Sequence, residues 1–394
     1  MKHNTEALIV GNQMARKAPL MSIAALVEEI RTRGGEFDRL SHVPRDVIAL
    51  MKKAGVFRSS TPSMFGGDIL PPAEFLRMVE AISAADGSAG WVAAFGSANT
   101  YMAGLPIKTQ RTIYQNSPDQ VFAGGLYPLQ KAERVDGGIK VSGRWKFASG
   151  CKGADWIGVG VWLNEPLFPG DLPGTTYMAI CPADQVEIIE NWDVVGMQGT
   201  GSHDTQVTDK FYSLDWICAR GGSVTIDEPI FRYPALAYQA QVHAAVNLGL
   251  ARDALDTVAG MSGAAKIMPG AIPLCDRAYY RTALAKGEAV LRGARAFYYE
   301  AVEDAWDTLV QGEPLSLEQN NLLRLSAAHA AHASAEVVQA AYRVAGISAI
   351  HKASRLQHIV RDSMVVTQHV SLSENIFEFA GAILAGVAPA KGYP

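Results

Sequence analysis

The pattern of hydrophobic residues changes twice along this chain of 394 residues, and the two changes constrain its fold. Residues 19–115 carry apolar side chains at helical spacing. Residues 121–230 contain short alternating runs separated by Gly and Pro, a pattern typical of strands. From residue 233 the helical pattern returns in longer, Ala-rich stretches. The order helices, strands, helices predicts three domains, with bounds 1–118, 119–230 and 231–394.

The predicted fold class is therefore α+β with several domains: an N-terminal helical domain, a central β-barrel or sandwich, and a C-terminal four-helix-type bundle. Residues 137–150, GGIKVSGRWKFASG, alternate after a Gly-Gly turn and indicate a hairpin. Three stretches near the C-terminus reach the length of bundle helices. Two shorter helices are expected after them. These five helices are expected at residues 238–261, 276–309, 316–346, 355–370 and 374–386.

Composition excludes several classes of function. A formal net charge of -4 leaves no basic surplus of the kind that favours nucleic-acid binding. No apolar run approaches the roughly 20 residues that a membrane span needs. Residues 1–21 lack the apolar stretch and cleavage site of a signal peptide. Four scattered cysteines without a CxxC pair indicate reduced thiols. We expect a cytoplasmic protein with no nucleic-acid or membrane partner.

Four short motifs occur in a fixed order, one in the first helical segment, two in the β-segment and one near the end. They are PSMFGG (62–67), the hairpin segment 137–150, GMQGTGSHD (196–204) and VRDSMVVTQHVSLSENIFEFAG (360–381). Together they resemble the acyl-CoA dehydrogenase superfamily over residues 40–385, including its helix–strand–helix layout. The resemblance implies a flavin site whose residues would be Gly124, Trp145, Phe147, Ser149, Thr200 and Ser202. In an unrelated β-domain, Trp145 and Phe147 would simply be core residues.

A residue about eight positions after the Arg-Asp pair of the last motif distinguishes two chemistries. An acyl-CoA dehydrogenase carries its catalytic Glu at this offset, whereas this chain has His369. Glu378 comes about eight residues too late and stays an alternative base. The His resembles the oxygenase components of two-component flavin monooxygenases. That resemblance implies His369 and Ser149 as catalytic residues that protect a C4a-hydroperoxyflavin, and the pKa of a His lies near working pH.

The same resemblance implies cofactors and partners. They are reduced flavin (FADH2 or FMNH2), O2 as co-substrate, a separate flavin reductase and a homotetrameric assembly. No G-x-G-x-x-G motif follows a strand, so reduced flavin must come from another protein. Arg277, Arg281, Arg292 and Arg295 lie along one helix. Some could reach a flavin phosphate across a subunit contact, and the rest would form a solvated face.

Trp91 and the residue eight positions later indicate the substrate. Phenol-hydroxylating members of the resembled group carry a His there, and this chain has Asn99, whose amide is not a general base near pH 7. The substrate-binding residues would be Asn99, Trp91 and His203. An electron-rich ring such as indole or indole-3-acetate fits first, and sulfoxidation of a thiophene-like substrate fits second. An acyl-CoA dehydrogenase using Glu378 and a binding protein without chemistry remain as alternatives.

The other histidines have plainer interpretations. His329, His332 and Glu336 share a helix face, but the paired Glu-x-x-His motifs of di-iron bundles are absent, so no metal is expected. His351 and His358 are expected at the surface or at an interface.

Overall fold

The computed structural model describes residues 18–222, 224–263 and 272–394. Most of the N-terminal segment that bears on the signal-peptide prediction lies outside the described residues. Helices occupy the first part of the chain, as the periodicity predicted. They are α1 (Ile23–Thr32), α2 (Glu36–Leu40), α3 (Arg45–Lys53), α4 (Pro72–Ser83), α5 (Gly87–Ala93), α6 (Asn99–Met102) and α7 (Ile107–Tyr114), with 3-10 turns η1 (Ser63–Phe65) and η2 (Ala94–Ser97).

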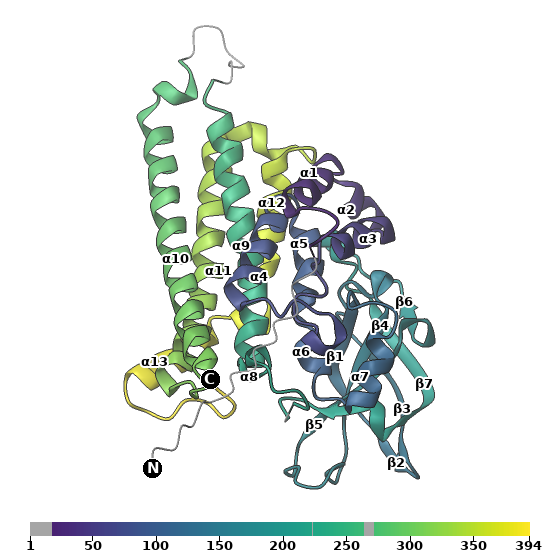
Figure 1. The fold of residues 1–394 in the computed structure, drawn as a ribbon. Helices are drawn as coiled ribbons and strands as arrows, with labels where there is room; N and C mark the ends of the chain where they lie inside the picture. The colour runs from purple at the N-terminus through teal and green to yellow at the C-terminus, as the bar shows by residue number, and fades with distance from the viewer. Residues whose placement is uncertain (1–17, 223, 264–271) are drawn as a thin grey trace, which may run out of the picture.

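Short local signals set the ends of these helices. Asp86 follows the end of α4 and caps α5. Its side chain accepts a hydrogen bond from the Ala89 N–H at 2.9 Å. Pro72 opens α4 at a first-turn position, where a missing N–H costs nothing. The predicted break around Asp86-Gly87 is confirmed. It turns the chain so that α5 packs beside α4, and both helices pack against α9 (Figure 1).

The central part forms two separate four-stranded sheets, which is the sandwich arrangement. One sheet has the order β1-β4-β5-β8 and the other the order β2-β3-β7-β6. The β2–β3 hairpin is confirmed, with Val135 opposite Gly138. The strands are β1 (Phe122–Lys131), β2 (Glu133–Val135), β3 (Gly138–Trp145), β4 (Trp156–Trp162), β5 (Thr176–Pro182), β6 (Glu187–Ile189), β7 (Asp204–Ser213) and β8 (Ile217–Ala219).

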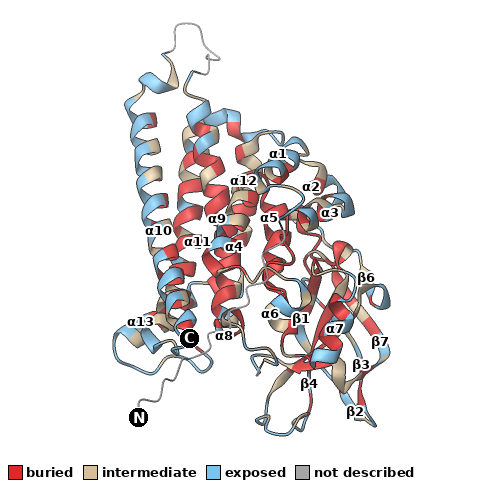
Figure 2. Ribbon diagram, in the orientation of Figure 1, coloured by how far each residue is buried: buried red, intermediate tan, exposed pale blue. Residues whose placement is uncertain are grey.

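The C-terminal part is the predicted helical bundle. Helices α9, α10, α11 and α12 pack against one another, and α4 and α5 pack on α9. Figure 2 shows buried residues running along α9 and α11, while one side of α10 is exposed. The helices are α8 (Pro229–Arg232), α9 (Ala235–Gly260), α10 (Ala278–Val310), α11 (Leu317–Ala345), α12 (Arg355–Val366) and α13 (Asn375–Leu384). Among the described residues, no helix is both long and apolar enough to span a membrane.

Candidate active site

Three aromatic side chains from distant parts of the chain meet where α5, α9 and the segment after α12 come together. The rings of Trp91 and His243 stack with centroids 4.1 Å apart and an angle of 14° between their planes. The His369 ring lies 4.3 Å from His243 and 5.7 Å from Trp91. Helix α12 ends at Val366, and the chain turns there to bring His369 against the buried face of α9. The structure thus places the predicted His369 and Trp91 in one cluster.

The hydrogen bonds of His369 fix its tautomer. Its Nδ1 accepts from the backbone N–H of Ser371 at 3.3 Å and lies 2.6 Å from the Ser371 hydroxyl. A nitrogen that accepts from a backbone N–H carries no proton, so the ring proton is on Nε2. Burial lowers the pKa of His369 to about 4. The expectation of a pKa near working pH was therefore wrong: a neutral ring with an Nε2–H donor is the form present at neutral pH.

The sequence did not single out His243, the third member of the cluster. Its ring is buried in α9, and Nδ1 has no hydrogen-bond partner within the described ranges. Burial and the neighbouring His369 lower the pKa of His243 well below its ordinary value. The only signal in the sequence was a lone His on an Ala-rich helix. Its partner Trp91 is too far along the chain for any spacing rule to find.

Ser149 lies at one end of a chain of hydroxyl groups. Its Oγ is 2.6 Å from the Ser202 Oγ, which is 2.7 Å from the Thr200 Oγ1. Thr200 donates in turn to the backbone carbonyl of Met197 at 2.8 Å. Thr200 and Ser202 are buried and spend their hydroxyl groups on this chain. Ser149 is buried as well, and the predicted flavin contacts of Thr200 and Ser202 stay predictions.

Trp145 and Phe147 differ sharply, although both were predicted to contact flavin. Trp145 is 0% exposed and its indole N–H donates to the Gly160 carbonyl at 2.8 Å. It is a core residue, so the prediction of a flavin contact was wrong. Phe147 follows the end of β3, has a φ of 61° and is 63% exposed. This left-handed conformation interrupts the strand alternation and leaves the ring open to a ligand.

His203, predicted to bind the substrate, lies against the backbone of Asn191 and Trp192. It is buried, and its Nδ1 accepts from the backbone N–H groups of Asn191 and Trp192 at 3.1 and 3.0 Å. These bonds hold the Trp192 segment, and the Trp192 ring meets Phe147 edge-on at 6.2 Å. His203 therefore holds the Trp192 segment beside Phe147, while its buried Nε2 has no hydrogen-bond partner among the described residues, and its predicted contact with a substrate stays a prediction. Gly124, on the partly exposed stretch of β1, is paired with Gly158 of β4.

Helix α5 connects the hydroxyl chain with the aromatic cluster. A Cβ at Gly150, next to Ser149, would lie 3.6 Å from the Val92 side chain, and Val92 follows Trp91 on α5. The glycine loop that carries Thr200 also packs on α5, because a Cβ at Gly199 would meet Ser88 at 2.9 Å. The loops that carry Ser149 and Thr200 thus both pack against α5, the helix that carries Trp91.

Asn99 is also buried, and its orientation is defined. The Nδ2 group donates to the Phe57 carbonyl at 2.8 Å and to the Thr61 hydroxyl at 2.7 Å. Because a carbonyl cannot donate, the amide nitrogen must point there and Oδ1 must point away. In the part of the chain that the structure describes, this oxygen has no hydrogen-bond partner.

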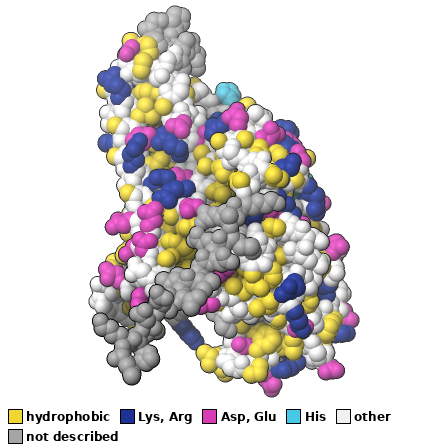
Figure 3. Space-filling model, viewed as in Figure 1, with side chains coloured by type: hydrophobic (Ala, Val, Ile, Leu, Met, Phe, Trp, Pro, Cys, Tyr) yellow, Lys and Arg dark blue, Asp and Glu magenta, His cyan; other side chains and the backbone are white. Residues whose placement is uncertain are grey.

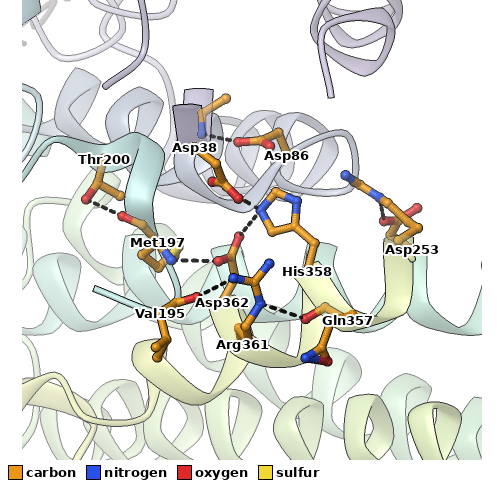
Figure 4. Close-up of polar contacts among 12 residues, drawn as sticks. Asp38, Asp86, Val195, Met197, Thr200, Asp253, Gln357, His358, Arg361 and Asp362 are labelled. Atoms are coloured by element: carbon orange, nitrogen blue, oxygen red, sulfur yellow. Dashed lines mark hydrogen bonds and ion pairs between the residues drawn. The ribbon is translucent and has the colours of Figure 1, made fainter. Parts of the chain in front are cut away.

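His358, expected at the surface or at an interface, is half-buried within this chain. Figure 4 shows it among Asp38, Asp86 and Asp362. Its Nε2 lies 3.0 Å from Asp362 Oδ2 and 3.6 Å from Asp38 Oδ1 as an ion pair rather than an aligned hydrogen bond. Burial alone would lower the pKa of His358. The Asp362 carboxylate, with Asp86 and Asp38, outweighs burial and raises the pKa to about 9.

The remaining candidates lie away from these residues. Glu378 is exposed on α13, which packs against α11, so its position does not support a catalytic base. Arg292 pairs with Glu288, and Arg295 pairs with Glu80, so both are engaged within the chain. On the face in Figure 3, both acidic and basic side chains lie along α10. A hollow of about 580 Å³ lies elsewhere, between Lys52, Arg58 and Asp119 among others.

The His332 Nε2 lies 2.8 Å from the Leu372 carbonyl oxygen, within hydrogen-bond distance, and so this nitrogen is already engaged. The described residues hold no group of three potential metal ligands. The donor set around the cluster instead fits a flat heteroaromatic cofactor. Ser149 offers an acceptor, the His369 Nε2–H is a donor and Phe147 presents an open ring. These are the groups that the edge and face of a flavin ring would need.

Comparison with known proteins identifies relatives over almost the whole chain. The family model for the acyl-CoA dehydrogenase C-terminal domain matches residues 241–374. An indole-3-acetate monooxygenase of Pseudomonas putida is 46% identical over 386 residues, 96% of this chain and 98% of the relative. Another, of Acinetobacter baumannii, is 37% identical and covers 97% of this chain and 98% of its own length.

The solved structures show the same fold. XiaF from Streptomyces sp., solved in complex with FADH2 and glycerol, superposes with a TM-score of 0.86 at 19% identity and covers 94% of this chain and 98% of its own. At this identity the likeness establishes the fold alone. The predicted acyl-CoA dehydrogenase-like fold and the resemblance to flavin monooxygenases are both confirmed. The near-full-length relatives show that the chain belongs to the family of the indole-3-acetate monooxygenases.

Proposed function

We propose that the protein is the oxygenase component of a two-component system. It takes reduced flavin from a separate flavin reductase and uses O2 to hydroxylate an indole derivative such as indole-3-acetate. Two relatives, at 46% and 37% identity, are named indole-3-acetate monooxygenases, and their names support the substrate class. The chain has no G-x-G-x-x-G dinucleotide motif after a strand, which supports a separate source of reduced flavin.

The observation that carries the proposal is the state of His369. It occupies the offset at which a dehydrogenase holds a catalytic carboxylate, and burial keeps it neutral with a proton on Nε2. A neutral imidazole of low pKa is a poor base for an acyl-CoA α-proton but a good hydrogen-bond donor. The exposed Glu378 provides no replacement base. The site is therefore suited to holding a reactive oxygen species rather than to abstracting a proton from carbon.

Each residue has a defined task in this proposal. Reduced flavin, when bound, supplies the electrons that activate O2, so that one oxygen atom can be transferred to the substrate ring. His369 donates a hydrogen bond from Nε2, and Ser149 accepts one from an N–H group of the flavin edge. Trp91 and His243 form a wall of stacked rings that excludes water. Asn99 accepts the substrate N–H through Oδ1, which has no partner among the described residues.

Stopped-flow mixing tests the proposal. Protein with dithionite-reduced flavin is mixed with oxygenated buffer and indole-3-acetate, and products are analysed by mass spectrometry with 18O2. We expect one labelled oxygen atom in the product. Faster turnover of phenols than of indoles would contradict the Asn99 argument. Bleaching of oxidised flavin by an acyl-CoA would show a dehydrogenase, and a sulfoxide from dibenzothiophene alone would show the thiophene-like substrate. No product and no bleaching would show a binding protein.

The assembly and the domain bounds are further parts of the proposal. We propose a homotetramer, which light scattering would test, supported by the resemblance to the oxygenase group. We also propose domain boundaries near residues 118 and 230. The change from helix to strand between Tyr114 and Phe122 supports the first, and the return to helix between Ala219 and Pro229 supports the second.

A further inference from the structure

The hydroxyl groups of Ser149, Ser202 and Thr200 can donate their hydrogen bonds in only one order. Thr200 Oγ1 lies 2.8 Å from the Met197 carbonyl, and a carbonyl oxygen can only accept, so the single Thr200 hydroxyl hydrogen is spent there. Ser202, at 2.7 Å, must then donate to Thr200. Ser149, at 2.6 Å, must in turn donate to Ser202. The hydroxyl hydrogen of Ser149 is therefore directed to Ser202, and its oxygen keeps a lone pair that can accept a hydrogen bond.

A further hydrogen bond fixes Met197 itself. Its backbone N–H donates to Asp362 Oδ1 at 2.6 Å, which anchors the residue whose carbonyl accepts from Thr200. The aligned hydroxyl hydrogen bonds from Ser149 to the Met197 carbonyl strengthen one another. Figure 4 shows Asp362 between Met197 and His358, with Thr200 bonded to Met197. On its other side, Asp362 Oδ2 lies 3.0 Å from His358 Nε2.

Close packing keeps the Met197 loop in this register. A Cβ at Gly196 would lie 2.4 Å from the Arg361 carbonyl oxygen, so the loop touches the α12 backbone where only glycine fits. Arg361 also donates to the Val195 carbonyl at 2.7 Å. The Met197 carbonyl accepts a further hydrogen bond from the Trp192 indole at 3.1 Å. Its role as the fixed acceptor therefore does not depend on Thr200 alone.

From this geometry we infer that Thr200 and Ser202 are positioning residues that make Ser149 an obligate hydrogen-bond acceptor and so select reduced over oxidised flavin. The inference rests on the proposed function. N5 of reduced flavin carries a hydrogen and donates, whereas N5 of oxidised flavin has only a lone pair. An acceptor at Ser149 pairs with the first and opposes the second. The hydroxyl chain thus favours the form that the reductase delivers and releases the form left after turnover.

The test measures binding of both redox forms, not turnover. FAD and FMN, oxidised or reduced with dithionite under nitrogen, are titrated into wild type, Thr200→Val and Thr200→Ser. Valine keeps the shape but cannot accept from Ser202, so Ser202 can donate to Ser149 and turn the Ser149 hydrogen outward. We expect the ratio of oxidised to reduced dissociation constants to fall on the order of tenfold in Thr200→Val. Thr200→Ser should keep the wild-type ratio.

A second readout and a second variant guard against misfolding. A tenfold change in that ratio lowers the midpoint potential of the bound two-electron couple by about 30 mV. Ser202→Ala, which removes the acceptor for Ser149 directly, should shift the potential in the same direction. Equal weakening of both redox forms in Thr200→Val and Ser202→Ala would show a merely structural role and overturn the inference. A wild type that binds neither FAD nor FMN would overturn the proposed function together with it.

Discussion

Burial lowers the pKa of His369 to about 4, so this imidazole is neutral throughout the range from pH 6 to pH 9. Replacing His369 with Ala removes the Nε2–H donor. We expect hydroxylated product per reduced flavin consumed to fall roughly tenfold, with a matching rise in hydrogen peroxide, as the loss of one buried hydrogen bond implies. His369→Gln keeps an N–H donor and should recover part of the loss. In wild type, a yield that rises as pH falls from 7 to 6 would show a charged ring and contradict this assignment.

His243 has a buried Nδ1 without a partner in the described segments, and such a nitrogen costs stability unless function requires it. We expect His243→Phe, which keeps an aromatic ring against Trp91, to raise the free energy of unfolding by about 1 kcal/mol and to lower turnover. His243→Ala should instead lower the free energy of unfolding by roughly 2–4 kcal/mol through the cavity that it leaves. Urea denaturation beside a turnover assay measures both. Full turnover in His243→Phe would show that the ring serves only for packing.

The sequence could single out residues that belong to a local motif, such as Ser149 and His369, whose catalytic roles are part of the proposed function. It could not separate Trp145 from Phe147, because both follow the same alternation until the positive φ at Phe147 reverses its side chain. It also could not find His243, because the stacking partner Trp91 comes from a different part of the chain. Contacts made only by tertiary packing leave no local pattern.

At the scale of elements, Asp362 of α12 accepts from the Met197 N–H and pairs with His358 on the same helix. Asp38 of α2, Asp86 of the α5 cap, Arg355 and Arg361 lie nearby. The pKa of His358 is raised from about 6.5 to about 9. Its stabilising contribution is therefore complete below pH 6.5 and is lost as pH rises through 9. We expect the melting temperature of wild type to fall between pH 7 and pH 9.5.

The variant His358→Gln removes the titrating cation, so its melting temperature should be lower at pH 6.5 and change less between pH 7 and pH 9.5. His351→Gln, at an exposed histidine, is the matched control and should follow wild type. The same slope in His358→Gln and in wild type would mean that another group titrates. Burial raises the pKa values of Asp38 and Asp86, so their ionisation also destabilises the folded protein as pH rises. The comparison of wild type with His358→Gln separates this effect from the titration of His358.

Helices and hairpins were predictable because capping residues, Gly-Gly turns and apolar periodicity act within a few residues. The β1 strand was not predicted: its Gly124-Gly125 pair and Pro128 break the alternation that marks a strand. It exists because β4 offers a parallel partner, with a register shift between Gly125 and Gln130 that accommodates the irregular stretch. A strand specified by its neighbour cannot be predicted from its own residues.

Across the whole molecule, the order of helices, strands and helices was predictable, but the contacts that join them were not. One such contact links the bundle to the N-terminal helices. Asp253 of α9 is buried and accepts from Arg355 of α12 at 2.7 Å. Arg355 also donates to the carbonyl of Ala85, just after α4, and Arg31 of α1 lies 3.6 Å from the Asp253 carboxylate. Three helices, α1, α9 and α12, thus share one buried carboxylate, and Arg355 links them to the residue just after α4.

Replacing Arg355 with Met would leave Asp253 buried with only the more distant Arg31 as a counter-charge. We expect a loss of roughly 2–4 kcal/mol in the free energy of unfolding, since an unpaired buried charge costs more than the pair contributes. The double variant Asp253→Asn with Arg355→Met removes both charges and should recover part of that loss. Urea unfolding followed by tryptophan fluorescence measures wild type, the two single variants Arg355→Met and Asp253→Asn, and the double variant. If the double variant were as unstable as the sum of the single variants, the two side chains would act independently, and the joining of bundle and N-terminal helices would have to rest on apolar packing alone.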